Sequence, residues 1–145
     1  MAPLWVAYGA NLGTLMRTCD AVGACMAVPP TDHYRRALDQ GDTLGGRFRP
    51  HVHWARPSKD GWIESMRSQG WRIMAVELAN GAVPSRLGTA LQPTVVLLGH
   101  EHEGIPPRWV ESADVCVEIP MVGKGASLNV AVAGSLVLYR LAGLS

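Results

Sequence analysis

At 145 residues, the chain has room for a single domain with its own core, and its 48% hydrophobic and 17% charged residues are typical of a folded globular protein. Its three cysteines are too few for a disulfide framework, and it has no uninterrupted apolar stretch of about 18 residues, so a disulfide-stapled scaffold and a transmembrane helix are not expected. A net charge of +1 does not by itself indicate nucleic-acid binding, and the N-terminal residues lack the features of a signal peptide, so we expect a cytoplasmic protein.

Strand-like and helix-like segments alternate along the chain. Short apolar runs bounded by glycine, proline or polar residues predict strands, and apolar residues three and four apart predict helices. Asn11 and Gly13 are expected to form a turn before the first helix, which Gly23 ends, and Ser58 and Ser127 are expected to cap the third and last helices. The predicted strands cover residues 4–8, 24–28, 51–54, 71–78, 94–98 and 115–119, and the predicted helices cover 14–22, 34–39, 58–69, 107–113 and 128–141.

This alternation predicts an α/β domain with a mostly parallel sheet and helices on both faces. The near-continuous apolar run at 94–98 fits a strand that is buried on both sides of such a sheet. Ligands of these sheets bind beyond the carboxyl ends of the strands. Four loops follow predicted strands, and we expect them to converge on one small-molecule site: residues 9–13, 77–81, 99–104 and 121–127.

The residues of these loops narrow the choice of ligand. No GxGxxG follows the first strand and no GxxxxGK[ST] is present, so neither a Rossmann dinucleotide site nor a P-loop is expected. Glu101 and Glu103 would repel the phosphates of a nucleotide cofactor. A cationic cofactor such as S-adenosylmethionine suits them better, but the residues alone leave the ligand open.

Two other constellations compete with a cofactor site. The pairs His51/His53 and His100/His102 have the His-x-His spacing that places two imidazoles on one side of a strand, where they could hold zinc. No cysteine pair with ligand spacing accompanies them, so we expect no metal. A nucleophilic Cys19 is also disfavoured, because this residue falls on the apolar stripe of its predicted helix.

Three motifs, in order along the chain, resemble those of a known family. The first is NLG at 11–13 followed by RTCDAVG at 17–23, and the second is GHE at 99–101 followed by EGI at 103–105. The third comprises IPM at 119–121, Gly123, SLNV at 127–130 and LY at 138–139. Together they resemble the SpoU/TrmH family of SPOUT methyltransferases, and the first motif is closest to the tRNA guanosine ribose 2′-O-methyltransferase branch.

The resemblance implies a fold, a cofactor and a reaction. The chain would be one SPOUT domain over residues 1–145, with a C-terminal trefoil knot and without extra terminal RNA-binding helices. S-adenosylmethionine would bind in the knot of a homodimer whose subunits complete each other's sites. The methyl group would pass to a ribose 2′-hydroxyl of RNA, with tRNA expected first. The alternative acceptors are rRNA and a small nucleoside. RNA binding could also come from a companion protein, and the alternative function is that of a non-catalytic RNA-binding member of the fold.

The resemblance also implies roles for single residues. Arg17 matches the family's catalytic arginine, and because arginine stays protonated it would clamp the substrate phosphate or act together with it. Asn11 would orient Arg17 or the phosphate, and Glu101 would hold the arginine or a loop of the partner subunit. Ser127 and Asn129, at the start of the last helix, would complete the catalytic set by contacting cofactor or substrate.

The cofactor pocket and the RNA surface are assigned in the same way. His100 stands where asparagine is common in the second motif. The residues expected to line the cofactor are Val76, Glu77, Leu78, Gly99, Ile119, Met121, Ser127 and Leu128. Eight of the thirteen basic residues lie between Arg35 and Arg72, and arginine forks match phosphate oxygens. The residues expected to contact RNA are Arg17, Arg35, Arg36, Arg47, Arg49 and Arg56.

Overall fold

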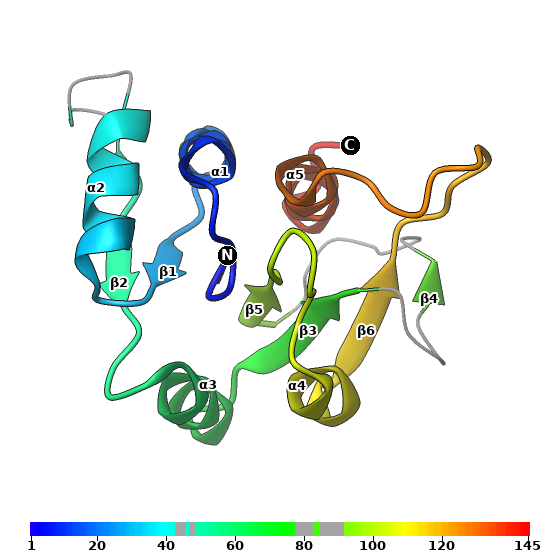
Figure 1. Ribbon diagram of the computed structural model, residues 1–145. Helices are drawn as coiled ribbons and strands as arrows, with labels where there is room; N and C mark the ends of the chain where they lie inside the picture. The colour runs from blue at the N-terminus through cyan, green and yellow to red at the C-terminus, as the bar shows by residue number, and fades with distance from the viewer. Residues whose placement is uncertain (43–45, 47–48, 78–82, 85–91) are drawn as a thin grey trace.

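A computed structural model describes residues 1–42, 46, 49–77, 83–84 and 92–145. Helices and strands follow one another in nearly the predicted order (Figure 1). The helices are α1 (Gly9–Val22), α2 (Asp32–Gly41), α3 (Lys59–Ser68), α4 (Pro107–Ser112) and α5 (Val130–Leu141). The strands are β1 (Met26–Val28), β2 (Val52–Trp54), β3 (Arg72–Val76), β4 (Val83–Pro84), β5 (Thr94–Leu97) and β6 (Val115–Glu118).

The strands form two parallel sheets that are joined by the N-terminal residues. β4, β6, β3 and β5 form one sheet in that order, and β1 pairs with β2 in the other. Ala2 donates its N–H to the Val96 carbonyl and accepts from the Leu98 N–H, and the Met1 carbonyl accepts from the Ala27 N–H. The parallel arrangement predicted from the sequence is therefore confirmed.

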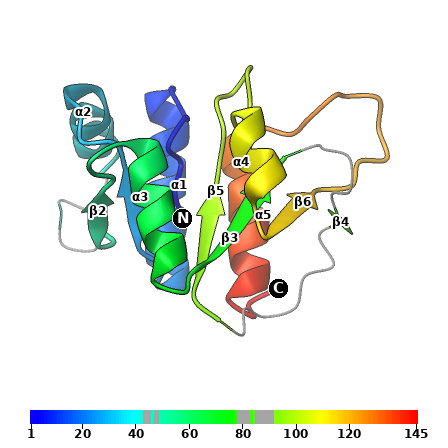
Figure 2. The same ribbon diagram turned by 90° about the horizontal axis from the view of Figure 1, so that it is seen from below.

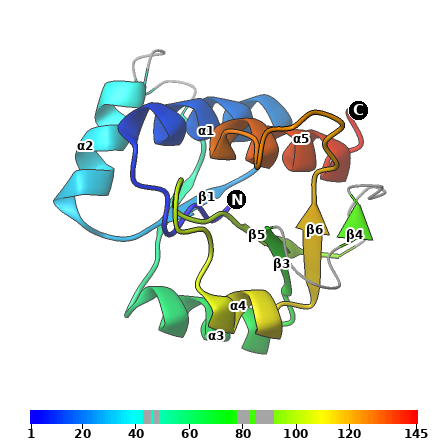
Figure 3. The same ribbon diagram turned by 45° about the vertical axis from the view of Figure 1, so that its right-hand side comes forward.

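Helices cover both faces of these sheets, as predicted (Figures 2 and 3). α1, α2 and α5 lie on one side, and α3 and α4 lie on the other. Each side has its own apolar core. Leu15 of α1 and Val137 of α5 belong to the first cluster, and Ile63 of α3 and Trp109 of α4 belong to the second. This layered packing confirms the α/β class.

The segment before α1 is not the strand predicted at residues 4–8. Pro3 has no N–H with which to continue a ladder of hydrogen bonds, and a side chain from α2 binds the segment instead. The Tyr34 hydroxyl lies 3.1 Å from the carbonyl oxygen of Leu4 and 2.7 Å from that of Val6. The backbone is thus held by side chains rather than by a neighbouring strand.

α1 begins at Gly9, earlier than the predicted start at Thr14. Asn11 and Gly13, predicted to form a turn, lie within the helix, because tertiary contacts override their local preference for turns. The helix ends as predicted at Gly23, whose φ of 72° is in the left-handed region that favours glycine.

The cap of α3 and the start of α4 agree with the sequence. Ser58 caps α3 as predicted, with its hydroxyl oxygen accepting from the Gly61 N–H at 2.9 Å. α4 begins at Pro107, a residue favoured in the first turn. Among the described residues, no helix combines the length and the apolar character that a membrane crossing requires.

α1 and α2 pack through a pair of glycines. A Cβ atom on Gly41 would lie 2.6 Å from the Cα of Gly13, so the helices would have to separate. We expect Gly41→Ala to lower the free energy of unfolding by about 1–3 kcal/mol, the usual cost of overpacking, as measured by urea denaturation. Gly9→Ala is the matched control, because its Cβ would meet that of Ala37 at an ordinary 3.7 Å. Equal losses in both variants would contradict the explanation.

Candidate functional site

A cavity of about 720 Å³ lies beyond the carboxyl ends of β3, β5 and β6, next to the start of α5. This volume is within the range of small-molecule sites. Its walls come from four segments, within residues 8–11, 76–77, 98–104 and 117–133. The described residues of three predicted strand-end loops therefore converge here, whereas the fourth predicted loop, residues 9–13, contributes Asn11 from within α1.

Most residues expected to bind the cofactor line this cavity. They are Val76, Glu77, Gly99, Ile119, Met121, Ser127 and Leu128, whereas Leu78 lies outside the described residues. Met121 is 39% exposed and Leu128 is 38% exposed, so both apolar side chains remain accessible to a ligand. Their part in binding stays a prediction.

The Glu101 carboxylate holds the segment that leads into α1. It accepts the N–H of Ala7 at 3.1 and 3.0 Å, the N–H of Tyr8 at 2.9 Å and the amide nitrogen of Asn11 at 3.2 Å. Burial opposes its ionisation, but hydrogen bonds from Tyr8, Ala7, its own backbone and Asn11 outweigh this effect, so the pKa of Glu101 is lowered. An ionised Glu101 therefore ties two of the cavity walls together.

Asn11 extends this connection to α5. Its buried side chain donates to Glu101, and its Oδ1 accepts from the Nδ2 of Asn129 at 3.0 Å. The Oδ1 of Asn129 in turn accepts the N–H groups of Ala131 and Val132 at 2.8 and 3.2 Å. A continuous hydrogen-bonded chain thus joins Glu101, through two asparagines, to the first turn of α5.

The loop at 99–104 is closed tightly by its glycines. His100 and Gly104 exchange backbone hydrogen bonds of 3.0 and 2.9 Å, and Gly104 has a left-handed φ of 73°. A Cβ on Gly99 would overlap the carbonyl carbon of Gly104. The Glu77 carboxylate accepts the Ile105 N–H at 2.9 Å and so fastens this loop to the end of β3.

The predicted cap of the last helix is wrong. α5 begins at Val130, and Asn129 rather than Ser127 is its N-cap. The asparagine oxygen reaches two first-turn N–H groups, while Ser127 lies exposed in the loop that lines the cavity. Ser127 therefore keeps its predicted place at the cavity but loses its predicted capping role.

Arg17 does not line the cavity. It follows Asn11 by six residues on α1, about 240° further round the helix. Its side chain is 56% exposed and forms an ion pair with Asp20, next to a hollow between α1 and α2. Within the chain, Arg17 therefore does not meet Asn11 or Glu101, which are bonded to each other and to neighbouring groups. That Asn11 orients Arg17 or the phosphate, and that Glu101 holds the arginine or a loop of the partner subunit, stay predictions.

Tyr8 and His102 form part of the cavity rim that the sequence did not assign. The Tyr8 hydroxyl and the Nε2 of His102 are 2.6 Å apart, and the Tyr8 ring lies edge-on to that of His100. Tyr8 is 49% exposed. No motif marks this tyrosine, because its position follows from the irregular segment that replaces the predicted strand.

Apart from Arg17 on α1, the described arginines expected to contact RNA lie on α2 and around β2, away from the cavity lining. They are Arg35, Arg36, Arg49 and Arg56, and Arg47 lies outside the described residues. The Arg35 guanidinium sits 4.8 Å from the centre of the Trp54 ring, and Arg49 pairs with Asp39 at 3.0 Å. RNA contact by this surface remains a prediction.

Cys19 is unsuited to nucleophilic chemistry. It is fully buried on α1, and burial raises the pKa of its thiol to about 11. The thiol is therefore protonated at neutral pH, whereas the thiolate is the nucleophile. This agrees with the expectation from the sequence.

Known proteins resemble this chain over most of its length. A sequence profile described as the SpoU rRNA Methylase family matches residues 6–139. The tRNA (guanosine(18)-2′-O)-methyltransferase of Aquifex aeolicus (strain VF5) is 33% identical over 131 residues, which are 90% of this chain and 62% of that protein. The 23S rRNA (guanosine(2553)-2′-O)-methyltransferase of Bacillus subtilis (strain 168) is 30% identical over 135 residues, which are 92% of this chain and 53% of that protein.

A solved structure agrees with this relationship. The AdoMet-bound rRNA methyltransferase from Sinorhizobium meliloti superimposes with a TM-score of 0.82 at 30% identity, over 97% of this chain and 54% of that one. The chain thus spans between half and two thirds of the length of these relatives. From the profile match, the identities and the shared fold, the chain belongs to the SpoU methylase family.

Proposed function

We propose that the cavity binds S-adenosylmethionine and that the protein transfers its methyl group to a ribose 2′-hydroxyl of RNA. The observation that carries the proposal is that all three family motifs meet at one cavity, through the hydrogen-bonded chain of Glu101, Asn11 and Asn129. Relatives named as guanosine 2′-O-methyltransferases and an AdoMet-bound relative of the same fold support it.

The chemistry of the cavity suits this cofactor. Ile119, Met121 and Leu128 offer apolar surface for an adenine ring. Glu77 and Glu118 bring carboxylates to a site for a ligand that carries a sulfonium and an ammonium group. When bound, the cofactor supplies an electrophilic methyl group, and Ser127 in the adjacent loop would contact cofactor or substrate.

The acceptor side of the reaction would depend on Arg17. A 2′-hydroxyl must lose its proton as it attacks, and arginine does not serve as a base at neutral pH, so the proton would pass to a phosphate oxygen of the substrate or to water. We therefore assign Arg17 to the phosphate beside the target ribose, where a bidentate guanidinium would fix the nucleotide. Asn11 and Glu101 would act as positioning residues that hold the cavity walls.

A homodimer would bring Arg17 to a cavity. α5 presents exposed apolar side chains at positions one and two turns apart: Val132, Leu136 and Tyr139. α1 lies beside it, and the hydroxyls of Thr18 and Ser135 are 2.8 Å apart. Two copies packed through α1 and α5 would bury the apolar stripe and place the Arg17 side chain of one subunit near the cavity of the other. The trefoil knot of the SPOUT fold belongs to the same proposal, with the segment after β6 as its threaded part.

We propose tRNA as the substrate, because the first motif is closest to the tRNA guanosine branch and because named relatives include tRNA guanosine methyltransferases. An rRNA substrate is the alternative that the relative from Bacillus subtilis supports. Action on RNA is consistent with the cytoplasmic location predicted from the sequence. Arg35, Arg36, Arg49 and Arg56 would contribute electrostatic contacts to the RNA backbone.

Titration calorimetry tests the cofactor half of the proposal. We expect S-adenosylmethionine to bind one site per chain, and Leu128→Arg to weaken this binding at least about tenfold by placing bulk and positive charge at the cavity. Circular dichroism checks that the variant is folded. The absence of binding to the wild-type chain, with or without RNA, would rule out the enzyme.

Incubation with labelled methyl donor and either tRNA or rRNA then identifies the acceptor. We expect label in tRNA, at a ribose 2′-oxygen. Label in rRNA alone would change the assigned substrate from tRNA to rRNA and leave the assigned reaction unchanged. Cofactor binding without transfer to either RNA or to free nucleosides would favour a non-catalytic RNA-binding member of the fold.

A further inference from the structure

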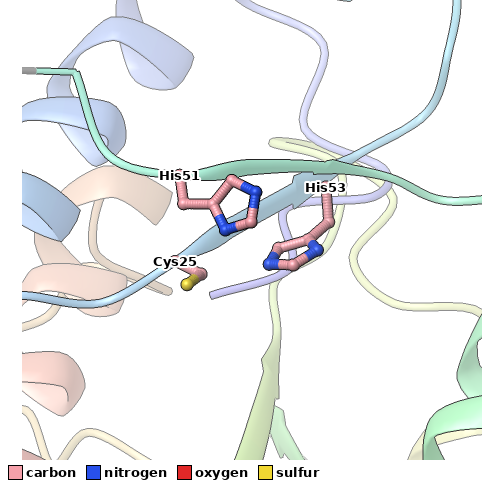
Figure 4. A group of neighbouring side chains, drawn as sticks. All are labelled: Cys25, His51 and His53. Carbon is pink, nitrogen blue, oxygen red and sulfur yellow. The ribbon is translucent and has the colours of Figure 1, made fainter.

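Cys25, His51 and His53 come together on the β1–β2 sheet (Figure 4). One ligand atom from each, the sulfur and one nitrogen of each imidazole, lies within 4.8 Å of the others. The two imidazole centres are 4.2 Å apart, and all three residues are exposed. None of them lines the cavity described above, so this cluster is separate from the proposed methyl-transfer site.

Strand pairing creates this cluster. His51 and His53 are two residues apart on an extended segment and therefore point to the same side. The parallel register pairs Met26 with Val52, and the Met26 N–H donates to the His51 carbonyl at 2.9 Å, which places Cys25 next to His51. Successive side chains of a strand point to opposite faces, and Met26, next to Cys25, packs into the first core cluster. The three ligand groups are thus left on the opposite face.

We propose that Cys25, His51 and His53 bind one Zn²⁺ ion. A thiolate and two imidazoles are a donor set that Zn²⁺ favours, and three protein ligands leave a fourth tetrahedral position for water. With Zn–S of about 2.3 Å and Zn–N of about 2.0–2.1 Å, the donor atoms of a tetrahedral site lie roughly 3.3–3.6 Å apart. The three ligand atoms now lie within 4.8 Å of one another, so they must approach by about 1 Å, and rotation of these exposed side chains allows that movement.

The proposed ion would fasten β1 to β2. These strands form a two-stranded sheet that is joined to the larger one through the N-terminal residues. Because an ion that binds only the folded chain stabilises it, Zn²⁺ would raise the thermal midpoint of unfolding. The sequence indicated His51 and His53 as a possible zinc pair but did not add Cys25 to it. The cysteine joins them only through the pairing of two strands 26 residues apart, which motif spacing does not reveal.

Metal titration of the full chain tests the proposal. Under reducing conditions, competition with a chromophoric chelator is expected to show one Zn²⁺ bound per chain. Co²⁺ is expected to give the absorption bands of a tetrahedral site together with thiolate-to-cobalt charge transfer. Cys25→Ser, His51→Gln and His53→Gln are each expected to weaken Zn²⁺ binding at least about tenfold.

Cys116→Ser is the matched control, because it removes another partly accessible thiol, far along the chain from this cluster. It is expected to keep wild-type affinity for Zn²⁺ and the thiolate band of the Co²⁺ form. The proposal is overturned if the wild-type chain takes up no Zn²⁺, if Cys25→Ser binds as tightly as wild type, or if Cys116→Ser loses the metal instead. S-adenosylmethionine binding is measured on the same samples. The cofactor site and the metal site are separate, so failure of one proposal can be told from failure of the other.

Discussion

Replacing Arg17 with alanine is expected to reduce methyl transfer at least about tenfold, while the fold and the binding of S-adenosylmethionine remain as in wild type. Arg17 is largely exposed and outside the cavity of its own chain, so neither the core nor the cofactor loses a contact. The proposed loss is that of a charged fork on the substrate phosphate. Transfer rates with saturating RNA, together with calorimetry for the cofactor, measure the two effects separately.

Two further variants distinguish this role from a structural one. Asp20→Asn breaks the ion pair with Arg17 but leaves the guanidinium in place, so transfer is expected to stay near the wild-type rate. Arg17→Lys keeps the charge but loses the bidentate geometry, and an intermediate rate is expected. If Asp20→Asn were as damaging as Arg17→Ala, the ion pair rather than the phosphate contact would explain the loss. Wild-type activity of Arg17→Ala would remove Arg17 from the mechanism.

A mixing experiment tests which subunit Arg17 serves. Arg17→Ala retains an intact cavity, and Leu128→Arg retains an intact Arg17. If the arginine acts across the dimer, unfolding and refolding the two impaired variants together is expected to add about one quarter of wild-type activity to their residual activity, since half of the dimers are mixed and each has one working site. If Arg17 serves its own chain, mixing restores nothing. The same samples report dimerisation by light scattering.

The sequence predicted the elements best where burial alone decides them. The short, near-continuous apolar run that became β5 fits a strand buried on both faces, and the apolar spacing of α1 fits a helix with one core face. It failed at residues 4–8 and at the start of α1, where side chains from distant parts of the chain bind the backbone. Tyr34 and Glu101 provide those contacts from α2 and from the loop after β5, and local propensity contains no information about them.

The candidate site shows the same division. Loops that follow parallel strands must meet at one edge of the sheet, so their convergence could be predicted without knowing any contact. Which side chains bond to each other within the site could not be predicted. Asn11 was expected to orient Arg17 or the substrate phosphate; within the chain it lies on another side of α1 from Arg17 and meets Asn129, 118 positions away. The motif therefore identifies residues that share a function without identifying which of them touch.

The loss of the Glu101 carboxylate is expected to destabilise the fold. Its carboxylate accepts hydrogen bonds from two backbone N–H groups and from Asn11, and an amide in its place offers one oxygen and two donors. We expect Glu101→Gln to lower the free energy of unfolding by about 2 kcal/mol, the scale of hydrogen bonds to a charged group, as measured by urea denaturation at neutral pH. Binding of S-adenosylmethionine is expected to weaken with it, because the cavity walls are no longer tied.

The pH dependence of this loss follows from the direction of the pKa shift. Because the folded-state pKa of Glu101 is lowered, its ionised form stabilises the fold fully above the ordinary glutamate range, and this contribution is lost as the pH falls through the folded-state pKa. The difference between wild type and Glu101→Gln should therefore shrink on acidification. Glu103→Gln, two residues away on the same loop and exposed, is the matched control, and at neutral pH it should unfold like wild type. A gap between wild type and Glu101→Gln that stays constant down to acid pH would show that the side chain acts through its shape and not through its charge.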